Sequence, residues 1–91
     1  IPAFPPVKRD LAFWVEKSAP YGTIEAVMRD ADPLLIATEL FDLFVQGQRR
    51  SLAFHLTFQA PDRTLESKEV DAIVDVIGRR LQSAAKAQLR R

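Results

Sequence analysis

The sequence predicts an α+β sandwich in which two helices cover one face of a four-stranded antiparallel sheet. Two segments, 8–17 and 51–59, alternate apolar and polar residues as half-buried strands do. Two other segments repeat apolar residues every three or four positions, as amphipathic helices do. The expected elements follow the order strand, helix, strand, strand, helix, strand. This βαββαβ order predicts two similar units packed into one sheet with its helices on one side.

The composition is that of one small globular domain. The 91 residues are 47% hydrophobic and 27% charged with a net charge of +1, which argues against disorder and against a strongly basic nucleic-acid binder. The chain has no cysteine and a single histidine, His55, so disulfides, thiolate chemistry and a histidine-based metal site are not expected. It lacks a membrane-spanning apolar run and a signal-peptide pattern, so we expect a cytoplasmic protein.

The chain opens with a proline-rich segment and continues into a strand. Residues 1–7 begin with Ile rather than Met, so we expect them to be a lead-in or the end of a linker in a longer protein. The domain itself is then expected over residues 8–91, and its first strand over 8–17. The apolar face of that strand carries Leu11, Phe13 and Val15.

A short helix and a hairpin are expected next. Thr23 is a candidate N-cap for the helix, and the Asp-Pro pair at 32–33 ends it, because a residue before proline avoids the helical region. The apolar positions of this helix are Ile24, Val27, Met28 and Ala31. Residues 34–45 form a strand that is apolar on both faces, and a turn at 46–49 joins it to the strand over 51–59. The core positions of the latter are Leu52, Phe54, Leu56 and Phe58.

A longer helix and a short strand complete the chain. The sequence leaves Thr64 and Ser67 as alternative caps of this helix. Its apolar stripe comprises Val70, Ile73, Val74, Ile77 and Leu81. Residues 87–90 are expected to form the last strand, with Leu89 inward and Arg90 outward. Such an arrangement is a ferredoxin-like sandwich, in which helices and sheet bury each other and the second sheet face stays open.

The open sheet face is the surface on which a domain of this size can work. Strand alternation assigns to it Asp10, Ala12, Trp14, Leu40, Asp42, Phe44, Ser51, Ala53, His55 and Thr57. Small residues let a flat ring approach the backbone, and stacking a base on an aromatic such as Trp14 or Phe44 contributes about 1–3 kcal/mol. Single-stranded RNA loops are the usual ligands of such faces. The alternative is that the two aromatics pack against a neighbouring domain or subunit.

Two other functions receive little support from the residues. An RNA recognition motif would place aromatics outward on the third strand, whereas Leu52 and Phe54 point to the core. Ser51 and His55 share a face, but four strand residues separate them by about 13 Å, which is too far for a nucleophile and its base. A glycine-rich phosphate loop is absent as well. We therefore expect no catalytic site in these residues.

The charge of the chain is unevenly distributed. After Asp75 there is no acidic residue. The basic residues that follow it are Arg79, Arg80, Lys86, Arg90 and Arg91. They indicate either a solvated helix face with a basic tail or a patch that faces phosphate groups.

Four short motifs resemble a known family. They are Arg9-Asp10-Leu11-Ala12, Glu39-Leu40-Phe41-Asp42, Arg50-Ser51-Leu52-Ala53-Phe54 and Asp62-Arg63-Thr64-Leu65. Their order and spacing are similar to those of the ferredoxin-fold anticodon-binding domain that closes the β subunit of bacterial phenylalanyl-tRNA synthetase. The similarity extends from Phe4 to Arg90. It implies a non-catalytic module that recognises the anticodon of tRNA(Phe).

The resemblance also implies a parent enzyme and a set of partners. The parent would ligate phenylalanine to tRNA with ATP and magnesium at a site outside these residues, and the domain itself would hold no cofactor. The implied partners are the tRNA(Phe) anticodon stem-loop, the rest of the β subunit and the α subunit. The residues alone leave two alternatives, a docking module without RNA and a small-ligand regulatory domain that pairs through its sheet edges.

The family pattern implies roles for particular residues. An outward aromatic after the Phe-Asp pair stacks on an anticodon base, and Phe44 occupies that position. Ser51 opens the third strand and contacts the same region, Ala12 lets the base approach, and Arg90 is a candidate phosphate contact. The expected RNA-binding set is Ala12, Trp14, Asp42, Phe44, Ser51, His55 and Arg90.

The sequence departs from the family pattern in four places. Phe44 stands where tyrosine is usual, so it keeps the stacking ring but loses a hydroxyl group. His55 stands where arginine is common, which weakens the local positive field near neutral pH. Trp14 replaces an aliphatic residue and adds either a stacking platform or a domain contact. The turn over 46–50 is several residues shorter than the usual loop.

Overall fold

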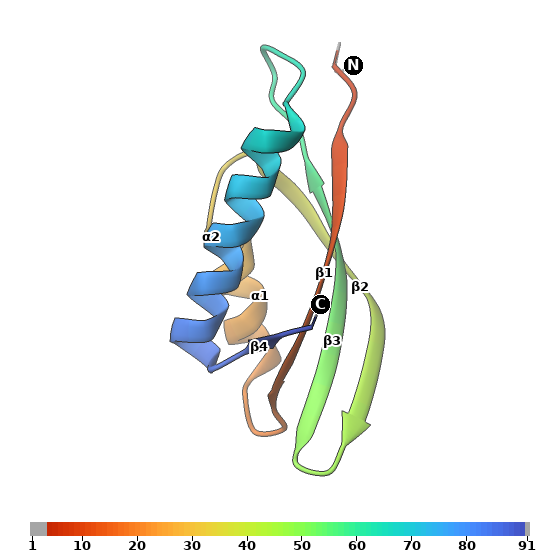
Figure 1. Cartoon of the computed structure of the whole chain (residues 1–91), viewed down its shortest axis with the longest axis vertical. Helices are drawn as coiled ribbons and strands as arrows, with labels where there is room; N and C mark the ends of the chain where they lie inside the picture. The colour runs from red at the N-terminus through yellow and green to blue at the C-terminus, as the bar shows by residue number, and fades with distance from the viewer. Residues whose placement is uncertain (1–3, 91) are drawn as a thin grey trace.

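The computed structural model describes residues 4–90 and confirms the ferredoxin-like α+β sandwich. Its elements are β1 (Val7–Glu16), α1 (Tyr21–Arg29), β2 (Leu35–Gln46), β3 (Arg49–Phe58), α2 (Ser67–Ala85) and β4 (Gln88–Leu89). The strands form one antiparallel sheet in the order β2-β3-β1-β4, and Figure 1 shows both helices on the same side of it. The parts of the expected lead-in and tail at residues 1–3 and 91 lie outside the described residues.

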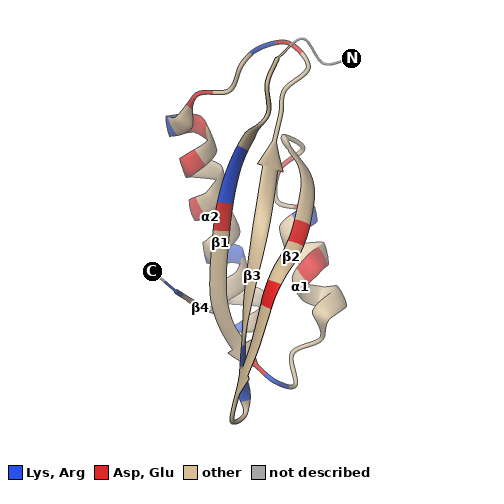
Figure 2. Cartoon of the chain, turned by 90° about the vertical axis from the view of Figure 1, so that its right-hand side faces the viewer, with Lys and Arg blue, Asp and Glu red and all other residues tan. Residues whose placement is uncertain are grey.

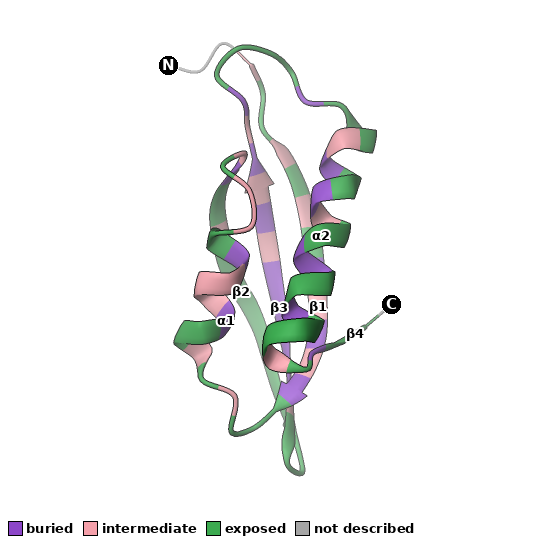
Figure 3. Cartoon of the chain, turned by 90° about the vertical axis from the view of Figure 1, so that its left-hand side faces the viewer, coloured by how far each residue is buried: buried purple, intermediate pink, exposed green. Residues whose placement is uncertain are grey.

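The core lies between the inner face of the sheet and the two helices. Figure 3 shows the buried positions along β3 and on the sheet-facing sides of α1 and α2. Phe54 is at its centre, because its ring is stacked on Phe13 with centroids 5.9 Å apart and on Tyr21 at 6.2 Å. The strand and helix positions expected to be buried do meet here, since Ile24, Met28, Ile77 and Leu81 are all fully enclosed. Among residues 4–90, neither helix is long and apolar enough to cross a membrane.

The helix caps differ from the expectation. α1 begins at Tyr21 with Pro20 in the N-cap position, so Thr23 lies inside the first turn and does not cap it. The proline ring fixes φ of Pro20 at −67°, which lets the helix start directly after it. Neither candidate caps α2, because Glu66 holds the N-cap position and no side chain bonds to the free amides there. Packing of the apolar stripes, rather than a cap, therefore sets where both helices begin.

Two contacts tie the ends of α2 to the segments on either side of it. Before the helix, Arg63 donates a 2.5 Å hydrogen bond to Glu69, and this carboxylate raises the pKa of Arg63. After the helix, Lys86 adopts the left-handed conformation with φ of 54°, and the Ala87 amide donates to the Leu81 carbonyl at 3.2 Å. This closure turns the chain directly into β4.

The register of β2 corrects one part of the predicted open face. Leu40 lies opposite Phe54, whereas Asp42 lies opposite Ala53, so Phe41 is an extra residue at a β-bulge. Opposed residues share a face, which places Leu40 on the side of the core residue Phe54 and not on the open face. Phe41, which alternation would place on the core face with Leu43 and Val45, is instead stacked on His55 on the open face. The prediction for Leu40 was therefore wrong.

The β2–β3 hairpin extends beyond the ends of the helices, as Figure 1 shows. Its two-residue turn has Gly47 at φ of 61°, a conformation that suits glycine. Leu43 lies opposite the core residue Leu52, yet it is 53% exposed, and Val45 nearby is 50% exposed. The helices do not reach this end of the sheet, so its inner face is uncovered there.

The last strand lies against β1, and a glycine of α2 makes room for it. Leu89 pairs with Phe13, and a Cβ atom on Gly78 would lie 3.0 Å from the Leu89 Cδ1. Leu89 therefore points inward as expected, and the Arg90 side chain reaches the open face, where it bonds to Ser51.

Candidate nucleic-acid interface

The strand register arranges the open face as rows that cross β1, β3 and β2, and Figure 2 views this face directly. The Trp14 row contains Trp14, Ser51 and Phe44; the Ala12 row contains Ala12, Ala53 and Asp42; the His55 row contains Asp10, His55 and Glu39; the Thr57 row contains Lys8, Thr57 and Ala37. Neighbouring rows are two strand residues, or about 7 Å, apart. The expected interface residues on the three long strands therefore lie side by side.

The Trp14 row carries the aromatic pair. The rings of Trp14 and Phe44 meet edge to face, with centroids 6.2 Å apart and an interplanar angle of 70°. Phe44 is on the edge strand and is 52% exposed, whereas Trp14 is half-buried on β1. Phe44 is thus the more accessible of the two rings for a stacking ligand.

Two arginines contact the Trp14 ring. The guanidinium carbons of Arg49 and Arg90 lie 4.9 and 5.6 Å from the ring centroid, within the range of cation–π attraction. Arg90 Nη1 donates to the Ser51 Oγ at 2.8 Å, and Arg49 Nη2 donates to the Gln88 Oε1 at 2.7 Å. Both guanidinium groups are therefore held in place while keeping further N–H donors for a ligand.

The backbone places these arginines on either side of Trp14 along the strands. Arg49 pairs with Glu16 at the hairpin end, and the Arg90 amide donates to the Ala12 carbonyl at 2.9 Å. Trp14 lies between these two register positions. The two arginines therefore approach the aromatic row from opposite directions along the strands, and both guanidinium groups end beside the Trp14 ring, where they can contact phosphate groups next to a stacked base.

Ser51 is on the open face but is not accessible to solvent. Its side chain is only 2% exposed, because Trp14 and Phe44 stand on either side of it and Arg90 bonds to its hydroxyl. The expectation that Ser51 is presented to solvent together with Phe44 was therefore wrong. In this structure the serine positions Arg90 instead.

The Ala12 row forms a low floor next to the aromatic row. Ala12 is half-buried and Ala53 is buried, and neither side chain rises above the sheet. Asp42 ends the row on the edge strand, and its exposed carboxylate makes no hydrogen bond or ion pair with any residue between 4 and 90. A flat ring can rest on this floor with a hydrogen-bond acceptor at its edge.

The His55 row holds an imidazole in a fixed orientation. Phe41 is stacked on His55 with centroids 3.8 Å apart and an interplanar angle of 8°. His55 Nδ1 lies 2.7 Å from Asp10 Oδ1, so the carboxylate fixes the rotation of the ring. Within the described residues, no three His, Cys, Asp or Glu side chains converge as metal ligands would.

Three contributors to this surface were missed by the sequence analysis. Arg49 continues the alternation of β3 by one step, so extending the strand into the expected turn would have found it. Gln88 lies opposite Trp14 because of the register in which β4 pairs with β1, and Phe41 reaches the open face because of the β-bulge in β2. No local sequence signal indicates either of these placements.

The basic residues near the C-terminus do not form one patch. Arg79 and Arg80 belong to α2, on the opposite side of the sheet, and donate to the backbone carbonyls of Asp75 and Asp30. Of the basic residues after Asp75 and up to residue 90, Arg90 alone contacts the aromatic row. Arg91 lies outside the described residues.

Comparison with known proteins gives one consistent result. A family profile described as the ferredoxin-fold anticodon binding domain matches residues 2–90. The chain is 41% identical over 95 residues to the phenylalanine–tRNA ligase beta subunit of Moorella thermoacetica, which covers 99% of this chain. It is 39% identical over 94 residues to that of Anaeromyxobacter dehalogenans and 38% identical over 93 residues to that of Coxiella burnetii, covering 99% and 96% of this chain.

The chain spans 12% of the length of each of these relatives. The family match, in contrast, covers almost all of this chain and agrees with the fold and the strand order. The chain therefore belongs to the ferredoxin-fold anticodon-binding domain family.

Proposed function

We propose that this chain is the anticodon-binding domain of a phenylalanine–tRNA ligase β subunit and that its open face binds the anticodon loop of tRNA(Phe). The observation that carries the proposal is the half-exposed Phe44 ring, which packs edge to face with Trp14 next to the low Ala12 row, while two arginines are held against the Trp14 ring. Aromatic rings and guanidinium groups on an open sheet are the groups that single-stranded RNA requires. The family to which the chain belongs supports the same conclusion.

In the proposed binding mode, each group has a distinct task. A loop base stacks on Phe44 and lies over Ala12 and Ala53, where its edge meets the Asp42 carboxylate. The adjoining phosphate groups accept hydrogen bonds from the N–H groups of Arg49 and Arg90. Stacking then senses the base, and the arginines fix its register.

The domain contributes recognition rather than chemistry. Phenylalanine, ATP and magnesium would be handled elsewhere in the parent enzyme, and this domain would bind no cofactor. With a net charge of +1, the isolated chain has little long-range attraction for RNA. The rest of the β subunit and the α subunit would supply most of the tRNA affinity by raising the effective concentration of the loop. A cytoplasmic location follows from this role.

A second candidate function is docking to a neighbouring domain or subunit. The exposure of Leu43 and Val45 at the hairpin end favours it, because such apolar surface is commonly covered by a partner. These residues are on the helix side of the sheet, so this contact would leave the open face free for RNA. Docking of the open face itself is the interpretation that competes with RNA binding.

The Phe44→Ala variant in the complete synthetase separates the two interpretations of the open face. Loss of one stacked base should raise KM for tRNA(Phe) by about 5- to 150-fold, the equivalent of about 1–3 kcal/mol. Phenylalanine activation, measured by pyrophosphate exchange, should stay unchanged. Normal aminoacylation together with failed subunit assembly would instead show that the open face is a docking surface. Phe44→Tyr, which keeps the ring, is the matched control.

A further inference from the structure

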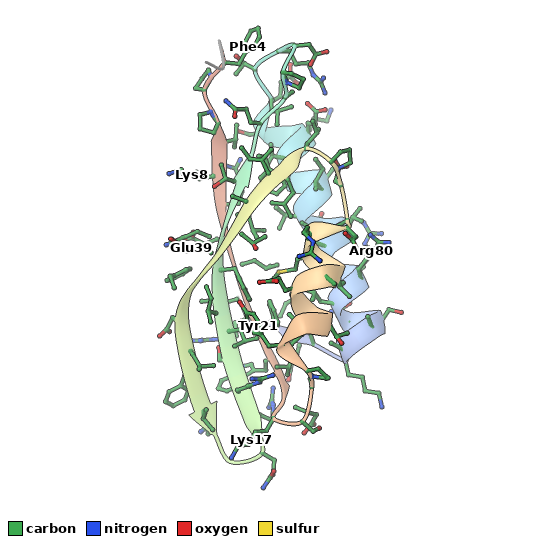
Figure 4. The ribbon with its side chains drawn as sticks, turned by 180° about the vertical axis from the view of Figure 1, so that it is seen from behind. Phe4, Lys8, Lys17, Tyr21, Glu39 and Arg80 are labelled. Atoms are coloured by element: carbon green, nitrogen blue, oxygen red, sulfur yellow. The ribbon has the colours of Figure 1, made fainter. Side chains whose placement is uncertain are left out.

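The open face also contains a hollow, away from the Trp14 row. It is a recess of about 490 Å³ whose lining comprises Lys8, Asp10, Ala37, Glu39, His55 and Thr57. These are the members of the His55 row and the Thr57 row. Figure 4 shows Lys8 and Glu39 on the side of the sheet away from the helices. The recess therefore belongs to the same surface as Phe44 but lies farther along β1 and β3.

His55 gives this recess a rigid flat wall. Phe41 covers one face of the imidazole, and Asp10 holds its Nδ1 at 2.7 Å. Because Phe41 is not part of the lining, the other face of the ring is the one turned to the recess. A planar ligand can stack there without reorganising the side chain, which lowers the entropic cost of binding.

The charges of the recess favour a base over a phosphate group. Asp10 and Glu39 bring two carboxylates to it and Lys8 brings one ammonium group. Figure 2 shows acidic positions along the middle of β1 and β2 and basic positions nearer the two ends of the sheet. Carboxylates repel phosphates but accept hydrogen bonds from amino groups of bases. Between residues 4 and 90, the Glu39 carboxylate has no hydrogen-bond or ion-pair partner, so it is free to accept one.

The spacing of the two sites fits a splayed loop. His55 and Ser51 are four residues apart on β3, which separates the His55 row from the Trp14 row by about 13 Å. Stacked neighbours in a nucleic-acid strand are only about 3.4 Å apart, so two bases in these sites cannot be stacked on each other. Bases that are turned out separately from a single-stranded loop can reach both.

We propose that this recess is a second nucleobase subsite, which takes an amino-bearing base, adenine, cytosine or guanine, from the loop that Phe44 engages. The base stacks on His55, and its amino group donates to the Glu39 carboxylate. Asp10 is a positioning residue that orients the imidazole. This inference rests on the proposed function, because it needs the same RNA loop on the open face.

The Glu39→Gln variant tests the subsite through the sign of its effect. Removing a negative charge from an RNA-binding face strengthens binding if that group makes no contact with the RNA. The subsite predicts the opposite, a loss of about fivefold in affinity for the tRNA(Phe) anticodon stem-loop, because the glutamine amide oxygen still accepts the hydrogen bond but lacks the negative charge that strengthens it. Glu25→Gln on α1 removes the same charge from the helix side and should not weaken binding.

The base is identified with stem-loops in which each amino-bearing loop base is replaced in turn by uracil. One replacement should cost the wild-type chain about tenfold in affinity and should cost Glu39→Gln clearly less, because its amide makes only a neutral hydrogen bond to the base. Equal or tighter binding by Glu39→Gln would overturn the subsite. If Phe44→Ala weakens binding while Glu39→Gln does not, the second subsite is refuted but the proposed function stands. If neither the wild-type chain nor the complete synthetase binds the stem-loop, the proposed function is refuted as well.

Discussion

Arg90 Nη1 donates a 2.8 Å hydrogen bond to the hydroxyl of Ser51, and this contact joins the residue after β4 to β3, across the intervening strand β1. The guanidinium is brought beside Trp14 by the same bond. A long side chain that is already held in position loses less entropy when it binds a phosphate group. If the open face binds RNA as proposed, the buried serine acts through Arg90 rather than by touching the base itself.

The Ser51→Ala substitution should therefore weaken RNA binding without opening the core. Arg90 loses its acceptor, so we expect affinity for the anticodon stem-loop to fall by about two- to tenfold, within the cost of ordering one long side chain. The free energy of unfolding should fall by about 1 kcal/mol, the usual net value of one hydrogen bond. Fluorescence titration and urea unfolding measure the two effects. Ser83→Ala on α2 serves as the control, and unchanged affinity in Ser51→Ala would contradict the positioning role.

The sequence was sufficient to predict the buried side of each element whose two faces differ in polarity. β1 and β3 alternate cleanly and the helices carry a single apolar stripe, so their buried sides were predicted correctly. β2 is different, because residues 40–45 are apolar on both faces and a one-residue shift leaves the pattern almost unchanged. The bulge at Phe41 is therefore invisible in the sequence, and it exchanges the sides of Leu40 and Phe41.

The candidate site was predictable to the same extent. Alternation on β1 and β3 placed Ala12 and His55 on the open face correctly. Alternation does not predict which neighbouring residues a side chain contacts on that face. The burial of Ser51 and the cation–π contacts of Arg49 depend on pairing between strands that are distant in sequence.

The two exposed glycines should respond to the same substitution with opposite sign. Gly47 has φ of 61°, where a Cβ atom costs about 1–2 kcal/mol, so Gly47→Ala should lower the free energy of unfolding by about that amount. Gly22 lies in α1, where an added Cβ atom would meet nothing within 4 Å, and Gly22→Ala should raise it by about 0.4–1 kcal/mol. Urea unfolding with an unchanged m-value checks both, and a stabilising Gly47→Ala would refute the turn geometry.

Arg49 should make a measurable contribution to the salt dependence of RNA binding. If its guanidinium contacts one phosphate, Arg49→Gln should reduce the slope of log K against log salt concentration by about 0.7, the value per phosphate for a single strand. Titrations of the anticodon stem-loop at several salt concentrations give that slope. Arg29→Gln on α1 removes an exposed charge that is paired with Glu25, and it should leave the slope unchanged. Equal slopes for Arg49→Gln and the wild-type chain would remove Arg49 from the interface.

Substitutions at Gly78 should affect the interface from the far side of the sheet. A Cβ atom there would lie 3.0 Å from the Leu89 Cδ1, so the branched side chain in Gly78→Val must displace Leu89. β4 has only two residues and Leu89 is its inward anchor, so this displacement should also free Arg90 from the Ala12 carbonyl. We expect the Arg90 amide to exchange with solvent faster and the stem-loop to bind more weakly, while α2 remains helical.

The Gly78→Ala variant is the matched control for this effect. Its single methyl group meets only the flexible end of Leu89, and alanine is favoured over glycine within a helix by about 1 kcal/mol. It should therefore keep wild-type RNA affinity and slow exchange at Arg90. Amide exchange measured by NMR, together with stem-loop titration, compares the two variants. Because neither substitution touches the open face, weaker binding by the valine variant alone would show that the packing of Leu89 on α2 positions Arg90 for RNA.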